Sequence, residues 1–206
     1  AGRISPQDLG LWKGEHVPGL GRIVQFVHAH GAAAGIQLAH AGRKASTSRP
    51  WEGDGPVQPP VGWRPIVAPS PLPFAAGHIT PEALSEEQIG QVIERFLAAT
   101  ERALDAGFDV VEVHAAHGYL IHEFLSPVSN RREDRWGGTF ENRIRLVMEV
   151  VRAVRRRWPE ARPLFVRLST TDWLDGAAWT IEDSVALARR LGAEGVDLVD
   201  CSSGGI

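Results

Sequence analysis

The chain of 206 residues is poor in cysteine, in long apolar runs and in excess charge of either sign. Its single cysteine, Cys201, cannot form an internal disulfide, which fits a reducing compartment and predicts a cytoplasmic protein. No run of about 18 apolar residues occurs, so neither a transmembrane helix nor a membrane partner is expected. A formal net charge of −3 argues against a nucleic-acid partner, because phosphate contacts require a basic excess.

Hydrophobic residues make up 43% of the chain, which is typical of a folded globular protein. Four short apolar runs have the composition of buried parallel strands. These runs cover residues 33–38, 109–114, 164–168 and 196–201. Helical patterns cover residues 20–30, 85–107, 141–158 and 181–192. The helix at 85–107 begins with a capping box formed by Ser85 and Gln88, and Thr180 is expected to cap the last helix.

The alternation of strands and helices predicts βαβ units, and therefore an α/β fold with a parallel sheet. Periodicity leaves open whether that sheet is doubly wound or closed into a barrel. No G-x-G-x-x-G motif follows a strand, which weakens the dinucleotide-binding interpretation. Residues 41–81 contain nine of the 14 prolines. We expect this segment to be a long excursion over the mouth of the sheet, not a linker between domains.

One stretch of the chain concentrates groups that can do chemistry. His114, His117 and Tyr119 lie just past the carboxyl end of the second predicted strand, the edge at which parallel α/β proteins form their sites. They fit three interpretations: a metal site with His122 as a third ligand, a pair of donors to an oxyanion beside a proton-donating tyrosine, or histidines with structural roles.

Other predicted strands also end in polar residues, namely Gln37, Arg167 and Ser202. These are hydrogen-bonding side chains of the kind that suit a polar, planar ligand better than a metal ion. The alternatives stay open at this level of argument.

Longer sequence segments favour one of these interpretations of the site. The segments are GRISP at 2–6, IQLAHAGRK at 36–44, HAAHGYL at 114–120, FLSPVSNRREDRWGG at 124–138 with ENR at 141–143, and VRLS at 166–169. In this order they resemble the Old Yellow Enzyme family of flavin-dependent ene-reductases, most of all its bacterial NADPH dehydrogenase branch. The resemblance implies a (β/α)8 TIM barrel, of which residues 1–206 would form a partial FMN-binding domain containing about the third to sixth strands.

The family's chemistry gives further expectations. Its members hold FMN non-covalently, accept hydride from NADPH or NADH, and reduce the C=C bond of activated alkenes such as enones. The resemblance therefore implies FMN as cofactor, NAD(P)H as reductant and a small α,β-unsaturated carbonyl compound as substrate. By the same resemblance, Gln37 would hydrogen-bond the pyrimidine edge of the flavin. Arg167 would stabilise the reduced, anionic ring with its fixed charge.

The resemblance also assigns the substrate side of the site. His114 and His117 would donate to the substrate carbonyl, where negative charge grows as hydride arrives. Ala115 and Ala116 lie between them and are expected in the substrate-binding segment. Tyr119 would protonate the α-carbon.

Several alternatives remain beside this interpretation. Arg167 could instead pair with Glu112, and His28, His30 and His122 are expected to be structural or surface residues. A dienoyl-CoA reductase relative with an added iron–sulfur domain would share the barrel. A metal-dependent hydrolase using the three histidines, or an inactive fragment that cannot hold FMN, would not share the activity. A homo-oligomer is compatible with the resemblance.

Overall fold

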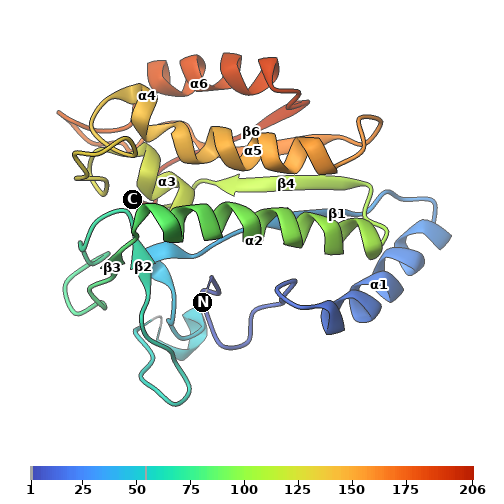
Figure 1. The fold of residues 1–206 in the computed structure, drawn as a ribbon. Helices are drawn as coiled ribbons and strands as arrows, with labels where there is room; N and C mark the ends of the chain where they lie inside the picture. Colours follow the sequence, from blue (N-terminus) through green and yellow to red (C-terminus); the bar gives the residue numbers. More distant parts are fainter. Residues whose placement is uncertain (1, 54) are drawn as a thin grey trace.

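A parallel sheet of four strands organises the computed structural model, which describes residues 2–53 and 55–206 (Figure 1). Its strands, in spatial order, are β1 (Gly35–Leu38), β4 (Val110–Ala115), β5 (Leu164–Ser169) and β6 (Leu198–Ser202). The α-helices are α1 (Val17–Ala29), α2 (Glu86–Asp105), α3 (Leu120–Leu125), α4 (Phe140–Arg143), α5 (Arg145–Arg157) and α6 (Ile181–Ala193). All four strands and the parallel sheet predicted from the sequence are thereby confirmed.

The predicted helix boundaries are also close to those observed, and the capping signals explain why. Ser85 accepts a hydrogen bond from the backbone N–H of Gln88, and the Gln88 side chain accepts one from the Ser85 N–H. Thr180 caps α6 in the same reciprocal way with Asp183. The single helix predicted at 141–158 is wrong in one respect, because Ile144 separates the short α4 from α5.

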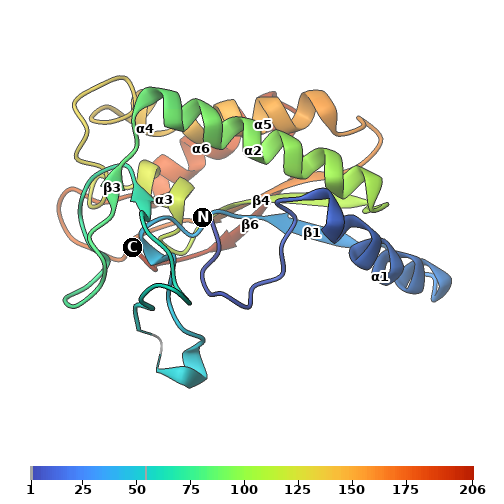
Figure 2. The ribbon, with the colours of Figure 1, turned by 60° about the horizontal axis from the view of Figure 1, so that its bottom comes forward.

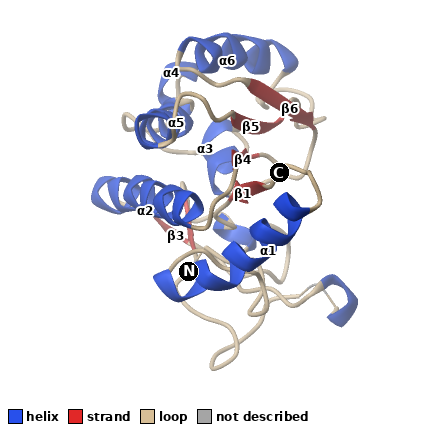
Figure 3. Ribbon diagram, turned by 90° about the vertical axis from the view of Figure 1, so that its right-hand side faces the viewer, coloured by secondary structure: helices blue, strands red, loops and turns tan. Residues whose placement is uncertain are grey.

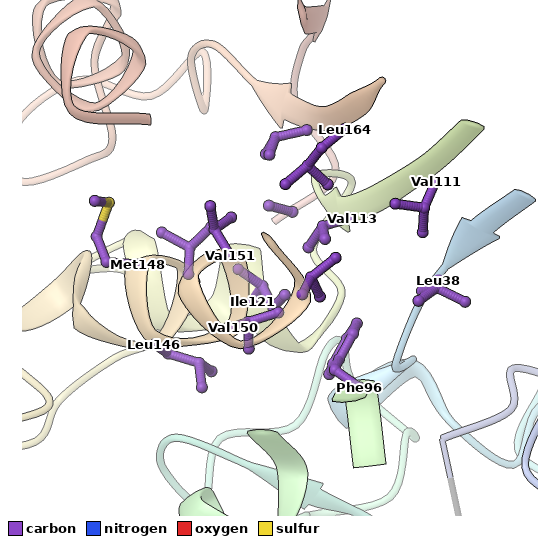
Figure 4. Packing of buried hydrophobic residues seen from close by; sticks show 14 of the residues in the cluster. Leu38, Phe96, Val111, Val113, Ile121, Leu146, Met148, Val150, Val151 and Leu164 are labelled. Carbon is purple, nitrogen blue, oxygen red and sulfur yellow. The ribbon is translucent and has the colours of Figure 1, made fainter. Parts of the chain in front are cut away.

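The two faces of the sheet differ in chemistry. On β4, Val111, Val113 and Ala115 are fully buried and point toward the helices. Figure 3 shows α2, α5 and α6 along that side of the sheet. Figure 4 shows side chains of the helices packing against side chains of the strands in this core. The intervening residues, such as Glu112 and His114, point to the opposite face because side chains alternate along a strand.

The proline-rich excursion is more ordered than expected. Short 3-10 helices at Gly42–Lys44 and Pro50–Glu52 lie within it, and β2 (Val67–Ala68) pairs in parallel with β3 (Glu82–Ala83). Figure 2 shows its tip extending away from the sheet. Its base is tied to the loop after α3, since Arg132 donates hydrogen bonds to the backbone oxygens of Pro69, 3.1 Å away, and Leu84, 2.6 Å away.

Helix α3 is a further element that the sequence did not predict. All six of its residues are buried, including the ionisable side chains of His122 and Glu123. One carboxyl oxygen of Glu123 accepts the backbone N–H of Arg43 at 2.8 Å, while the other is buried without a hydrogen-bond partner. Burial raises the pKa of Glu123 to about 8, so the carboxyl group is mainly neutral at pH 7.

The turn that Glu123 contacts depends on a glycine. Gly42 has a φ of +60°, and a Cβ atom there would lie 2.1 Å from Oε1 of Glu123. Only glycine fits both the backbone conformation and this close approach. Glu123 and Gly42 together fix the start of the excursion against α3.

Replacing Glu123 by Gln tests this buried carboxyl group. The folded protein keeps the Glu123 proton up to about pH 8, whereas the unfolded chain releases it near pH 4.5. The Glu123 contribution to the free energy of unfolding therefore falls as pH rises from about 5 to 8, by up to about 1.4 kcal/mol per pH unit. Denaturant titrations across this range should show that the stability of Glu123→Gln relative to wild type increases with pH. Glu87→Gln, at an exposed position of α2, is the control, and a difference that stays constant with pH would refute the interpretation.

Candidate active site at the carboxyl end of the sheet

Strand register brings the main polar side chains onto one face. His114 on β4 is the register partner of Arg167 on β5, and Arg167 is the partner of Asp200 on β6. Gln37 on β1 is the partner of Glu112 on β4. Register partners in parallel strands project from the same side of the sheet. All five side chains therefore project from the face opposite to α2 and α5.

The three residues expected to act on substrate lie together. The imidazole rings of His114 and His117 have centroids 5.1 Å apart, and the rings of His114 and Tyr119 are also 5.1 Å apart. Both pairs meet edge to face. His114 lies near the carboxyl end of β4, whereas His117 and Tyr119 belong to the turn that leads into α3. The structure thus brings the sequence motif into one cluster at the carboxyl end of the strands.

The hydrogen bonds of His114 indicate its tautomer. Its Nδ1 accepts the backbone N–H of Ala116 at 3.3 Å, so the ring proton of the neutral imidazole sits on Nε2. Burial, and then the nearby charges of His117 and Arg167, lower the pKa of His114 to about 4. His114 is therefore a neutral hydrogen-bond donor at pH 7.

His117 is held in an unusual backbone conformation. Its φ of +60° lies in the left-handed region, which is costly for a residue with a Cβ atom. Its backbone N–H donates to Oγ of Ser169 at 2.9 Å, and its carbonyl accepts from Nζ of Lys44 at 2.8 Å. Its ring Nε2 lies 2.6 Å from Oγ of Ser202. Burial lowers the pKa of His117 as well.

Arg167 does not pair with Glu112, the alternative partner considered from the sequence. Gln37 donates from Nε2 to Glu112 at 2.6 Å, so Glu112 is engaged by the amide. Arg167 pairs instead with Asp200, with Nε 3.2 Å from Oδ2. That contact is an ion pair without the geometry of a hydrogen bond, and Nε of Arg167 is buried with no hydrogen-bond partner.

His122 makes hydrogen bonds of its own with residues outside the His114–His117 pair. Its Nδ1 accepts the backbone N–H of Gly118 at 2.9 Å, and its Nε2 lies 2.9 Å from Oδ1 of Asp172. Both ring nitrogens are thus engaged, and the expectation that His122 serves as a third metal ligand is wrong. In the part of the chain that the structure describes, no group of three His, Cys, Asp or Glu side chains could hold a metal ion.

The remaining predicted histidines and alanines also have defined places. His122 is wholly buried, so it is not a surface residue. His28 and His30 are exposed. The side chain of Ala115 belongs to the hydrophobic core, and Ala116 is fully buried beside the cluster. Their contact with substrate stays a prediction.

Sequence reasoning missed three residues that shape the cluster: Lys44, Ser169 and Asp172. Ser169 ends β5 and Asp172 follows that strand, at the same edge as the motif, so their position relative to the strand was an available signal. Lys44 is 73 positions away from His117 along the chain, and no local pattern predicts their contact.

Comparison with known proteins identifies the family. All residues, 1–206, match the model of the NADH:flavin oxidoreductase / NADH oxidase family. An NADH:flavin oxidoreductase of Gibberella zeae is 50% identical over 218 aligned residues, which cover the whole of this chain and 53% of that protein. An NADPH dehydrogenase of Halalkalibacterium halodurans is 47% identical over the whole chain and 55% of its own length. The chain thus spans about half the length of these curated relatives.

Solved structures agree with this grouping. A 2-naphthoyl-CoA reductase in complex with 2-naphthoyl-CoA is similar with a TM-score of 0.85 and 29% identity, over 98% of this chain and 31% of that one. Morphinone reductase in complex with tetrahydroNAD is similar with a TM-score of 0.79 and 32% identity, over 93% of this chain and 55% of that one.

Among the described residues, no helix is long and apolar enough to cross a membrane. The four parallel strands and their helices form part of a TIM barrel. The chain belongs to the NADH:flavin oxidoreductase / NADH oxidase family.

Proposed function

We propose that this chain is part of an FMN-dependent NAD(P)H oxidoreductase that reduces the C=C bond of α,β-unsaturated carbonyl compounds. One observation carries the proposal. The imidazoles of His114 and His117 meet at the carboxyl end of β4, and burial lowers the pKa of both. Arg167, the register partner of His114 on β5, presents a fixed positive charge on the same face. The names of the relatives support the oxidoreductase class.

The chemistry of the open face fits the flavin ring of FMN. The buried Nε of Arg167 has no hydrogen-bond partner, and such a donor is costly unless a ligand satisfies it. The amide Nε2 of Gln37 donates a hydrogen bond to Glu112, which leaves the amide oxygen to accept one from a ring N–H. A planar ring with both N–H and C=O groups along one edge would use both side chains.

When bound, FMN would carry hydride from NAD(P)H to the β-carbon of the alkene. His114 and His117 would bind and orient the carbonyl oxygen of the substrate. The neutral Nε2–H of His114 donates to that oxygen without a change of protonation between pH 5 and 8, because its pKa is about 4. Donors fixed before the reaction stabilise the growing negative charge without the cost of reorganising water.

Tyr119 would supply the proton to the α-carbon. The centroid of its ring lies 5.1 Å from that of His114, so the two side chains belong to the same cluster. A phenol keeps its proton at neutral pH, as a general acid must. A homo-oligomeric state and a cytoplasmic location stay predictions.

A CoA thioester is a second candidate substrate. The observation that favours it is the similarity to 2-naphthoyl-CoA reductase over 98% of this chain. An α,β-unsaturated thioester has the same polarised C=C bond as an enone and would use the same two imidazoles. Comparing kcat/KM for cyclohex-2-enone with that for an enoyl-CoA ester distinguishes the two substrate classes.

Removing the two imidazole donors tests the substrate side. His114→Ala combined with His117→Ala should weaken binding of phenol to the FMN-loaded protein by at least about 100-fold, since each lost hydrogen bond to a charged or polarised oxygen contributes about 1.5–3 kcal/mol. Flavin absorbance titrations would measure the dissociation constant. His30→Ala, which removes an exposed imidazole at the C-cap of α1, is the control. Unchanged phenol affinity in the double variant would exclude the proposed substrate site.

Replacing Arg167 by Met tests the cofactor side. Loss of the fixed cation should lower the reduction potential of the bound flavin by tens of mV, because the reduced anionic ring loses more stabilisation than the oxidised ring; about 30 mV corresponds to 1.4 kcal/mol for a two-electron couple. A spectroscopic redox titration gives the potential. Arg189→Met, on the exposed side of α6, should leave it unchanged. A potential that does not fall in Arg167→Met would place the flavin elsewhere.

A further inference from the structure

His122 and Asp172 form a buried pair that the proposed reaction does not use. Their side chains are 0% exposed, and they come from different segments, α3 and the loop after β5. The distance between Nε2 of His122 and Oδ1 of Asp172 is 2.9 Å. An ionisable pair that is wholly removed from solvent is costly to maintain unless every polar atom is satisfied.

Hydrogen bonding defines the direction of the pair. The backbone N–H of Gly118 can only donate, so Nδ1 of His122 is the acceptor and the neutral ring carries its proton on Nε2. That proton is donated to Asp172. The other carboxylate oxygen of Asp172 accepts from Oγ of Ser126 at 2.6 Å and from the backbone N–H of Trp179 at 2.8 Å.

Those donors keep the carboxylate ionised. Burial alone would raise the pKa of Asp172, but the hydrogen bonds from His122, Ser126 and Trp179 outweigh it and hold the pKa below its usual value. A carboxylate that accepts from Nε2 makes Nδ1 of the same ring a better acceptor. Asp172, His122 and the Gly118 backbone thus form a series of two hydrogen bonds, one on each ring nitrogen of His122.

The end of that series is the turn that carries the substrate-site residues. Gly118 lies between His117 and Tyr119, and both His117 and Gly118 have left-handed φ values, +60° and +70°. A histidine keeps such a backbone only where its surroundings enforce it. The hydrogen bond from the Gly118 N–H to His122 is the contact at the centre of this turn.

We propose that His122 and Asp172 are positioning residues that hold the 117–119 turn in its left-handed conformation and so place His117 and Tyr119 for the substrate. The proposal rests on the proposed function. Neither residue touches the reacting atoms. The pair also joins the loop after β5 to the turn after β4, so both sides of the mouth share one anchor.

Two substitutions of His122 separate the two halves of the series. Asn places an amide oxygen near the position of Nδ1 and can still accept from the Gly118 N–H, but it is too short to reach Asp172. Gln places an amide nitrogen near the position of Nε2 and can still donate to Asp172, but it loses Gly118. Both replace a buried ring with a smaller amide, so His122→Asn serves as the matched control for the packing loss in His122→Gln.

The experiment measures phenol affinity of the FMN-loaded protein, hydrogen exchange of the Gly118 amide, and thermal stability. We expect His122→Gln to bind phenol at least tenfold more weakly and to expose the Gly118 amide to exchange. His122→Asn should stay within about threefold of wild type in affinity and keep that amide protected. Equal losses of affinity in both variants, in proportion to their loss of Tm, would overturn the proposal in favour of a purely structural role.

Two measurements on the unsubstituted protein guard against variants that do not fold. Nitrogen-15 NMR should show His122 protonated at Nε2 and unprotonated at Nδ1, and the opposite tautomer would overturn the proposal. The Gly118 amide should be protected from exchange whether or not FMN is bound. If the wild-type protein binds neither phenol nor cyclohex-2-enone, the proposed function fails, whereas the tautomer and the exchange of Gly118 still decide whether the pair holds the turn.

Discussion

A buried helix that carries ionisable side chains must satisfy them inside the protein, and this constraint shapes the carboxyl end of the sheet. Helix α3 places His122 and Glu123 next to each other, so they leave the helix in different directions. His122 reaches the loop after β5 through Asp172, and Glu123 reaches the turn after β1 through the Arg43 backbone. Two loops that are distant in sequence are thereby fixed against one short helix.

The sheet contributes a second level of organisation. Its helix-covered face is a continuous apolar core, whereas the other face carries Gln37, Glu112, His114, Arg167 and Asp200 in register. Such polar groups on the inner face of a barrel are expensive unless they bind one another or a ligand. The strands therefore set the positions of Gln37, His114 and Arg167, and the turn held by α3 sets the positions of His117 and Tyr119.

Much of this arrangement follows from the sequence. Apolar runs, capping boxes and the position of His114 at a strand end depend on local spacing, and the structure confirms the elements that they predict. Helix α3 was missed because all its faces are buried, so it has no amphipathic period. Glu112, the alternative partner considered for Arg167, and Asp200 lie on the two strands beside β5, and only the register shows that Asp200 lies opposite Arg167. The contacts of Lys44 and Asp172 could not be predicted, because they depend on how loops meet in space.

The left-handed backbone at His117 limits which residues can replace it. A left-handed conformation strongly disfavours β-branched and bulky residues, and among side chains with a hydrogen-bond donor it is tolerated best by asparagine. An asparagine there would keep a hydrogen-bond donor, on a shorter side chain, without the titration of an imidazole. The shape of one turn therefore restricts which side chains can stand at this position.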